Sequence, residues 1–323
     1  MALVEARLEE EKNAAAVVSP KTSAALSVKN VLFATDFSFT SESARPYAIA
    51  LCRHFGSTLH TAHVLSDVNI VAMTGGVDYV GLSALYEDAR SQAKEKLSQI
   101  SSRLRGIPHR DYVPHGGIWE NLAEIVEENR IDVIVLGTHG RTGLGKLLLG
   151  SVAENILRHA LCPVLTVGPK VCGRAKLSAN SGNDLSPLDL DLRQIVFATN
   201  FAPNSSRIAK HAVSLAEEFQ SRLTLLHVTE NYRQRGSRTT PIEDELGRLR
   251  NLIPENTLLQ YRPDTVVEFG FPSDRILKIA SKLEADLIVL GARAAEAGNT
   301  HLPWSTAHHV IAGAHCPVLT IRG

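Results

Sequence analysis

NVLFATDF, at Asn30–Phe37, decides the fold, because it returns as QIVFATNF at Gln194–Phe201, 164 positions later. Further matches follow in the same order, at a spacing of 164 and then 154 positions: Leu59–Val64 with Leu223–Val228, Ile131–Gly137 with Ala285–Gly291, and Cys162–Gly168 with Cys316–Gly323. Several matches in one order are the signature of an internal repeat. The chain therefore contains one domain in two copies.

Within each copy, short β-branched runs alternate with helical patterns. In the first copy the expected strands are Val31–Thr35, Thr58–Val64, Tyr112–Val113, Val133–Leu136 and Pro163–Val167. The expected helices are Ser41–Phe55, Leu82–Leu104, Ile118–Glu128 and Ser151–His159. Strands that alternate with helices predict a parallel sheet with right-handed crossovers. We therefore predict an α/β protein of two tandem doubly wound, Rossmann-like domains, each with a five-stranded parallel sheet.

The boundaries of the domains follow from composition. Residues 170–191 are rich in Ser, Asn, Gly and Asp and have no apolar period, which indicates a linker. We predict a flexible tail at 1–27, repeat 1 at 28–169, this linker, and repeat 2 at 192–323.

Charge and cysteine content limit the partners and the setting. Lys plus Arg and Asp plus Glu number 34 each, so no net charge draws the chain to nucleic acid or to anionic lipid. No run approaches the length of a membrane span, and the acidic N-terminus does not look like a signal peptide. Four cysteines without a C-x-x-C pair suit a reducing compartment. We expect a cytoplasmic protein that binds neither nucleic acid nor membranes.

The stretch GTHGRTGLGKLLLGS, Gly137–Ser151, contains two candidate phosphate loops. The first is G-x-x-x-x-G-K at 140–146, but a Walker A loop needs Ser or Thr next, for Mg²⁺, and this chain has Leu147. A Walker loop also follows the first strand of its domain, whereas this stretch follows the fourth. The Walker interpretation is therefore disfavoured.

The second interpretation is G-x-x-G, nine residues, then G-S, and it gives each residue type a role. Gly137 and Gly140 let the backbone approach a phosphate without an intervening Cβ. Gly150 does the same where a helix begins, and Ser151 adds its N–H and the positive end of the helix dipole. Arg141 and Lys146 add positive charge from the loop.

This motif, placed between an apolar fourth strand and a helix that ends at CPVL, resembles the ATP-binding branch of the universal stress protein family. The resemblance covers both repeats and implies an adenine nucleotide as ligand: ATP, with Mg²⁺ or Mn²⁺ as its metal. It implies that Asp36 reaches the ribose or the metal shell and that the backbone of Val64 pairs with adenine. Ala34 lies where the family often has proline. The remaining implied residues are Leu136 and Gly137, which line the pocket, and Gly140, Gly150, Ser151 and Val152, which hold the phosphates.

Each of these residues also has a purely structural interpretation. Asp36 could cap the helix that follows, Gly137 and Gly150 could be ordinary turn glycines, and Val64 could be a core residue. His63 and its counterpart in repeat 2 are interpreted as structural. The joint pattern favours a nucleotide site, because helix caps do not require this spacing.

Repeat 2 has lost the motif. Asn200 stands at the position of Asp36, Ala294 at that of Gly140 and Trp304 at that of Gly150. We therefore expect repeat 2 not to bind ATP in the family's manner. It is expected instead to be a structural partner of repeat 1, paired through the last strands as domains of the family commonly are. The alternative is a different ligand near Arg293, His301 and Trp304.

Three functions compete. The favoured one is a nucleotide-dependent stress-response regulator with one ATP in repeat 1. The alternatives are a weak, metal-assisted ATP hydrolase and an interaction scaffold without nucleotide. The sequence offers no convincing catalytic base or paired carboxylate near the loop, so we expect at most slow hydrolysis assisted by a divalent metal. A homodimer stays open, because an internal pair still has exposed sheet edges.

Overall fold

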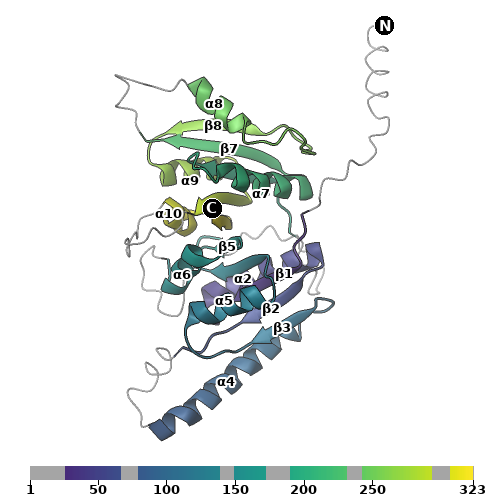
Figure 1. Ribbon diagram of the computed structural model, residues 1–323, viewed down its shortest axis with the longest axis vertical. Helices are drawn as coiled ribbons and strands as arrows, with labels where there is room; N and C mark the ends of the chain where they lie inside the picture. The colour runs from purple at the N-terminus through teal and green to yellow at the C-terminus, as the bar shows by residue number, and fades with distance from the viewer. Residues whose placement is uncertain are drawn as a thin grey trace.

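The structure is a computed structural model that describes residues 26–66, 79–138, 149–171, 190–230, 242–292 and 306–322. The tail at 1–25 and the centre of the linker therefore lie outside the described residues. Figure 1 shows the two repeats as two stacked halves, with the C-terminus in the middle of the molecule. Element labels follow that figure.

Each repeat has the same series of elements. Those of repeat 1 are β1 (Asn30–Ala34), α2 (Phe39–Phe55), β2 (Thr58–Ala62), α4 (Tyr79–Ser101), β3 (His109–Tyr112), α5 (Ile118–Glu128), β4 (Val133–Gly137), α6 (Ser151–His159) and β5 (Val164–Val167). Those of repeat 2 are β6 (Gln194–Thr199), α7 (Ser205–Glu218), β7 (Arg222–Thr229), α8 (Ile242–Arg250), β8 (Asp264–Phe269), α9 (Pro272–Lys282), β9 (Leu287–Ala292), α10 (Thr306–Gly313) and β10 (Val318–Arg322).

The ten strands form one sheet in the order β3-β2-β1-β4-β5-β10-β9-β6-β7-β8. Strands within a repeat are parallel, whereas β5 and β10 pair in antiparallel fashion where the repeats meet. The chain runs outward from β1 to β2 and β3, then returns to place β4 on the other side of β1. The predicted pair of doubly wound, five-stranded parallel sheets is confirmed, and the two sheets are joined into one.

Helices cover both faces of the sheet, and each face has a core that extends through both repeats. One core joins the α2 and α7 faces and includes Phe33 and Phe197, which are at most 1% exposed. The other lies under α5, α6, α9 and α10 and includes Ile156 and Val310. Leu26 and Val28 pack against the first core, at the predicted boundary between tail and domain. The apolar strand runs of the sequence are thus buried on both faces.

Several element boundaries differ from the sequence prediction by one to three residues, and two of the differences have a clear physical reason. Helix α2 begins two residues earlier than expected, because the Ser38 hydroxyl accepts the N–H of Ser41 and acts as the N-cap. Strand β3 begins three residues earlier, at His109. It is an edge strand with exposed, charged residues, so it lacks the apolar run that marks the inner strands.

A buried polar network in repeat 1 has no titratable counterpart in repeat 2. His60 is 2% exposed, and its Nδ1 lies 3.0 Å from the hydroxyl of Tyr112, which donates to Asn129 Oδ1 at 3.0 Å. Thr224 occupies the position of His60 in repeat 2 and accepts from Gln194 at 3.0 Å. Burial, with a smaller contribution from Arg110, lowers the pKa of His60 from its ordinary value.

The lowered pKa makes the stability of the protein depend on pH. The unfolded chain takes up a proton on this histidine at a higher pH than the folded chain does. The contribution of neutral His60 to the free energy of unfolding is therefore complete above about pH 6.5 and is lost as the pH falls below that value. We expect His60→Thr, which copies repeat 2, to reduce the fall in free energy of unfolding between about pH 7.5 and about pH 5. Urea unfolding at both values measures this, and identical pH slopes for the variant and the parent would contradict it.

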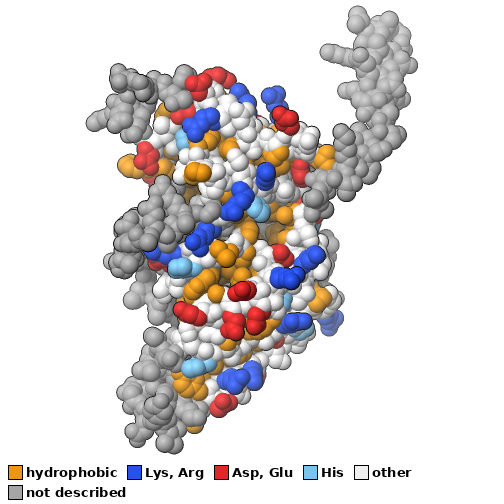
Figure 2. Space-filling model, in the orientation of Figure 1, with side chains coloured by type: hydrophobic (Ala, Val, Ile, Leu, Met, Phe, Trp, Pro, Cys, Tyr) orange, Lys and Arg blue, Asp and Glu red, His pale blue; other side chains and the backbone are white. Residues whose placement is uncertain are grey.

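The surface carries charges of both signs. On the face shown in Figure 2, basic and acidic side chains are interspersed around smaller apolar areas. Among the helices of the described residues, none is both long and apolar enough to cross a membrane.

Candidate functional site

The order of the strands reverses between β1 and β4, and ligands of doubly wound sheets bind outside the carboxyl ends of the strands at such a point. Ala34, the last residue of β1, pairs with Leu136 of β4 on one side and with Ala62 of β2 on the other. Asp36 and Val64 follow β1 and β2, and Gly137 is the last residue of β4. Most of the predicted site residues are thus brought to one edge of the sheet.

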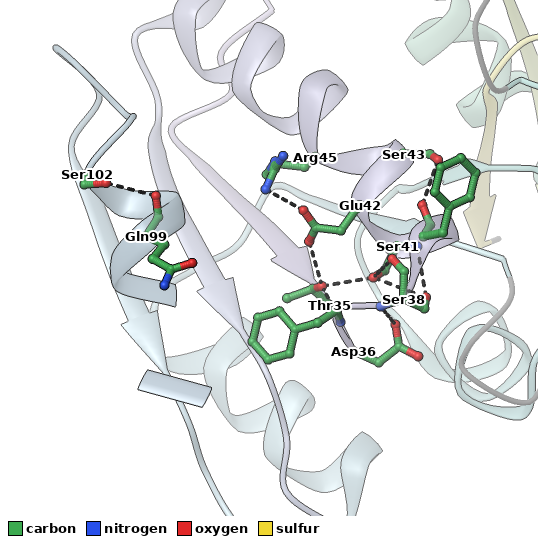
Figure 3. Close-up of polar contacts among 11 residues, drawn as sticks. Thr35, Asp36, Ser38, Ser41, Glu42, Ser43, Arg45, Gln99 and Ser102 are labelled. Carbon is green, nitrogen blue, oxygen red and sulfur yellow. Dashed lines mark hydrogen bonds and ion pairs between the residues drawn. The ribbon is translucent and has the colours of Figure 1, made fainter. Parts of the chain in front are cut away.

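Figure 3 shows how the turn from β1 to α2 is built. The Asp36 carboxylate accepts the N–H of Ser38 at 3.0 Å, and the Thr35 hydroxyl accepts the N–H of Phe37 at 3.0 Å. Phe37 has a φ of 61°, so these bonds hold a residue in the left-handed region. Asp36 does not cap the helix, because Ser38 does. The helix-cap interpretation of Asp36 is therefore wrong.

Asp36 is held in its charged form. Partial burial acts to raise its pKa, but hydrogen bonds from the hydroxyl and backbone of Ser38 and from the hydroxyl of Ser41 outweigh that effect. The pKa of Asp36 is lowered from its ordinary value as a result. A carboxylate thus stands ionised beside the carboxyl end of β1 at neutral pH.

The phosphate-loop motif is described at its two ends. Gly150 donates its N–H to the carbonyl of Thr138 at 2.8 Å, which closes the base of the loop at the start of α6. Gly150 is the residue before the helix, Ser151 is its exposed first residue, and Val152 is 37% exposed. The N-terminus of α6 therefore presents an accessible first turn at the end of β4. Gly140, Arg141 and Lys146 lie outside the described residues.

Gly137 is required for a reason that the sequence does not reveal. A Cβ built at this position would collide with the carbonyl oxygen of Thr40 and would lie 2.6 Å from the carbonyl carbon of Thr40 and 2.8 Å from Cα of Ser41. This glycine lets β4 pass close to the first turn of α2, so its lack of a side chain is explained by packing of the strand against the helix. Repeat 2 keeps a glycine here, Gly291, but an added Cβ there would meet a side-chain atom of α7, Cδ1 of Ile208, at 2.8 Å and not the helix backbone.

Val64 follows β2 and is 7% exposed, so its side chain belongs to the core. Next to it, His63 Nδ1 donates to the carbonyl of Thr35 at 2.8 Å. The His63 ring lies 4.4 Å from that of Phe37, and the Lys96 ammonium lies 5.1 Å from the Phe37 ring centroid. His63 therefore ties the end of β2 to the turn after β1, which agrees with its structural interpretation.

Repeat 2 reproduces this turn without the charge. The Thr199 hydroxyl accepts the N–H of Phe201 at 3.1 Å, and the Asn200 amide oxygen accepts that of Ala202 at 3.1 Å. His227 Nδ1 donates to the carbonyl of Thr199 at 2.8 Å. An amide is thus sufficient for the turn, and the carboxylate of Asp36 adds only its charge. Ala294 and Trp304 lie outside the described residues.

Thr35, Ser38 and Ser41 build the turn that holds Asp36, and none of them was among the candidate residues. The Thr35 hydroxyl lies 3.0 Å from that of Ser41, and repeat 2 has the matching bond between Thr199 and Ser205 at 2.9 Å. Comparing the two repeats could have found this pair, because both copies keep it. Residues that both repeats keep support the fold, whereas residues that only repeat 1 keeps are candidates for a functional role. Among the described residues, no three His, Cys, Asp or Glu side chains gather as a metal site.

Comparisons with known proteins agree with this architecture. The model of the universal stress protein family matches residues 27–168 and again residues 192–322. Universal stress protein MJ0577 of Methanocaldococcus jannaschii is 31% identical over 157 residues, which cover 44% of this chain and 96% of that protein. Universal stress protein MJ0531 of the same organism is 30% identical over 139 residues, which cover 43% of this chain and 81% of its own length.

A solved structure extends the similarity to the whole tandem arrangement. The crystal structure of a universal stress protein from Archaeoglobus fulgidus has a TM-score of 0.67 and 20% identity, and covers 93% of this chain and 98% of its own. At that identity the likeness speaks for the fold alone. With two family matches across most of its length, this chain belongs to the universal stress protein family and carries two copies of the family's domain in tandem.

Proposed function

We propose that this protein is a nucleotide-dependent stress-response regulator that binds one ATP, in repeat 1. The observation that carries the proposal is the charge of Asp36. The turn needs only an oxygen acceptor, which Asn200 supplies in repeat 2, yet repeat 1 has an ionised carboxylate there. This charge lies at the switch point of the sheet, where a doubly wound fold places its ligand.

The proposed site has three parts. Asp36 would accept a ribose hydroxyl or bind in the shell of a Mg²⁺ or Mn²⁺ ion, and the backbone of Val64 would pair with adenine. Ala34, Leu136 and Gly137 would line the pocket. The residues proposed to hold the phosphates are Gly140, Arg141, Gly150, Ser151 and Val152. The accessible N-terminus of α6 suits them, because unpaired N–H groups and the helix dipole favour an anion.

In this proposal repeat 2 is a structural partner. Its last strand, β10, pairs with β5, and both cores continue across that junction. Repeat 2 would thus hold repeat 1 in its folded form while the nucleotide state of repeat 1 is read by a partner protein.

The test uses two reciprocal substitutions. Asp36→Asn copies repeat 2, so it should keep the turn and leave the melting temperature within about 2 °C of the parent. Because a hydrogen bond to a charged group contributes about 1.5 kcal/mol or more, ATP affinity should fall about tenfold in the presence of Mg²⁺. Isothermal titration calorimetry measures the affinity.

Asn200→Asp is the matched control, and it should leave ATP affinity and stoichiometry unchanged. Unaltered affinity in Asp36→Asn would remove the observation on which the proposal rests. An equal loss of affinity in both variants would show that the change acts through general stability and not through the site in repeat 1.

A further inference from the structure

The junction between the repeats is nearly symmetric. Leu165 of β5 lies opposite Leu319 of β10, and these two residues occupy the same position in their repeats. On either side, the Thr166 hydroxyl donates to the carbonyl of Val318 at 3.0 Å, and the Thr320 hydroxyl donates to that of Val164 at 3.2 Å. A local two-fold axis therefore passes between the two leucines, and equivalent positions of the repeats face each other across it.

On the α2 and α7 face, one pair of equivalent positions has diverged into complementary residues. Phe55 and Phe219 are equivalent and lie 6.1 Å apart between ring centroids. Beside them, His54 Nε2 lies 2.9 Å from a carboxylate oxygen of Glu218, its own equivalent. Two copies of repeat 1 would bring two histidines together here, and two copies of repeat 2 would bring two carboxylates together.

On the α6 and α10 face, a second equivalent pair differs in size. Gly168, just after β5, is buried, and a Cβ there would collide with the carbonyl oxygen of Ile311 in α10. At the spacing of 154 that relates Leu165 to Leu319, its equivalent is Arg322, which precedes Gly323. The guanidinium of Arg322 donates to the carbonyl of His159 at the end of α6, at 3.0 Å. Two copies of repeat 2 would force an arginine into the space of the glycine, and two copies of repeat 1 would lack the bond from Arg322.

We propose that these two pairs make the junction selective: repeat 1 fits repeat 2 and rejects a second copy of itself. His54 and Glu218 select by the hydrogen bond of the mixed pair and by the repulsion that two glutamates would have, whereas Gly168 and Arg322 select by shape, and the two pairs lie on opposite faces of the sheet. When equivalent positions of a symmetric interface carry different, complementary residues, pairing of two identical domains is disfavoured. The chain is thereby directed to join its own two halves. This selectivity is independent of nucleotide.

The shape pair is tested by Gly168→Arg in the full chain without nucleotide. Because α10 must move away from β5, the melting temperature should fall by about 5 °C or more. Gly247→Arg is the control, since a Cβ at Gly247 in α8 meets nothing within 4 Å, and it should change the value by about 2 °C or less. Gly168→Ala is a milder variant in case the arginine prevents folding, and it should also lower the melting temperature. Parental stability in Gly168→Ala and Gly168→Arg would overturn the shape selection.

The charge pair is tested by a double-mutant cycle. His54→Glu reproduces the Glu–Glu contact of two like repeats and should lower the melting temperature by about 2 °C. Adding Glu218→Lys to His54→Glu restores opposite charges, so the double variant should be more stable than the sum of its single variants predicts. Simple additivity of the two changes would overturn the charge selection.

Discussion

Replacing Gly150 with Trp is expected to abolish ATP binding while the fold is kept. The variant copies repeat 2, which has Trp304 at this position. Gly150 has φ of −64° and ψ of 148°, which any residue adopts, and it directly precedes the exposed first turn of α6. An indole there would occupy the space in which the proposed site holds the phosphates. Affinity should fall by about 100-fold or more, which corresponds to about 2.7 kcal/mol.

Gly150→Ala separates the size of the side chain from the loss of glycine itself. The backbone accepts alanine without strain, so the melting temperature of both variants should stay close to that of the parent, and the alanine variant should bind ATP more tightly than the tryptophan variant. Isothermal titration with ATP and Mg²⁺ gives the affinities. If Gly150→Trp binds as the parent does, the phosphates do not lie at the start of α6.

Replacing Gly137 with Ala is expected to have the largest effect on stability. The added Cβ would collide with the carbonyl oxygen of Thr40. It would also lie 2.6 Å from the carbonyl carbon of Thr40 and 2.8 Å from Cα of Ser41, so all three atoms that it meets belong to the backbone. Backbone in the first turn of α2 cannot rotate away as a side chain does, so β4 and α2 must separate. We expect the free energy of unfolding to fall by about 2–3 kcal/mol.

Gly291→Ala provides a matched comparison in repeat 2. Its Cβ would meet the Cδ1 atom of Ile208 at 2.8 Å, and a flexible side chain can move. Urea unfolding of both variants should show a clearly smaller loss for Gly291→Ala. Equal losses would mean that the close approach of Thr40 is not what fixes Gly137 as glycine.

Much of the fold could be predicted because the inner strands are buried on both faces. Val31–Phe33 and Val133–Leu136 are continuous apolar runs, and each is almost fully buried in its strand. Because the domain is duplicated, the strands of repeat 2 could be predicted by aligning its sequence with that of repeat 1. The edge strand β3 was misplaced because its solvent-exposed residues carry no such run.

The candidate site was predicted less completely, because local geometry decides the role of each residue. The sequence shows that Asp36 becomes Asn200, yet only the hydrogen bonds show that the turn survives this change. The contact between Gly137 and Thr40 joins residues almost a hundred positions apart, which no local pattern reveals. The selective contacts at the junction were missed for the same reason, since they appear only when equivalent positions face each other.

The most direct test of the central claim is to count the adenine nucleotide bound per chain. The full-length protein is incubated with ATP and Mg²⁺, freed of unbound nucleotide and denatured, and the released nucleotide is quantified against protein. The proposed site in repeat 1, beside a repeat 2 that lacks the motif, requires a value close to one nucleotide per chain. A value close to two would show that repeat 2 binds as well. A value close to zero would show that the motif of repeat 1 no longer binds nucleotide, and the proposed function would be wrong.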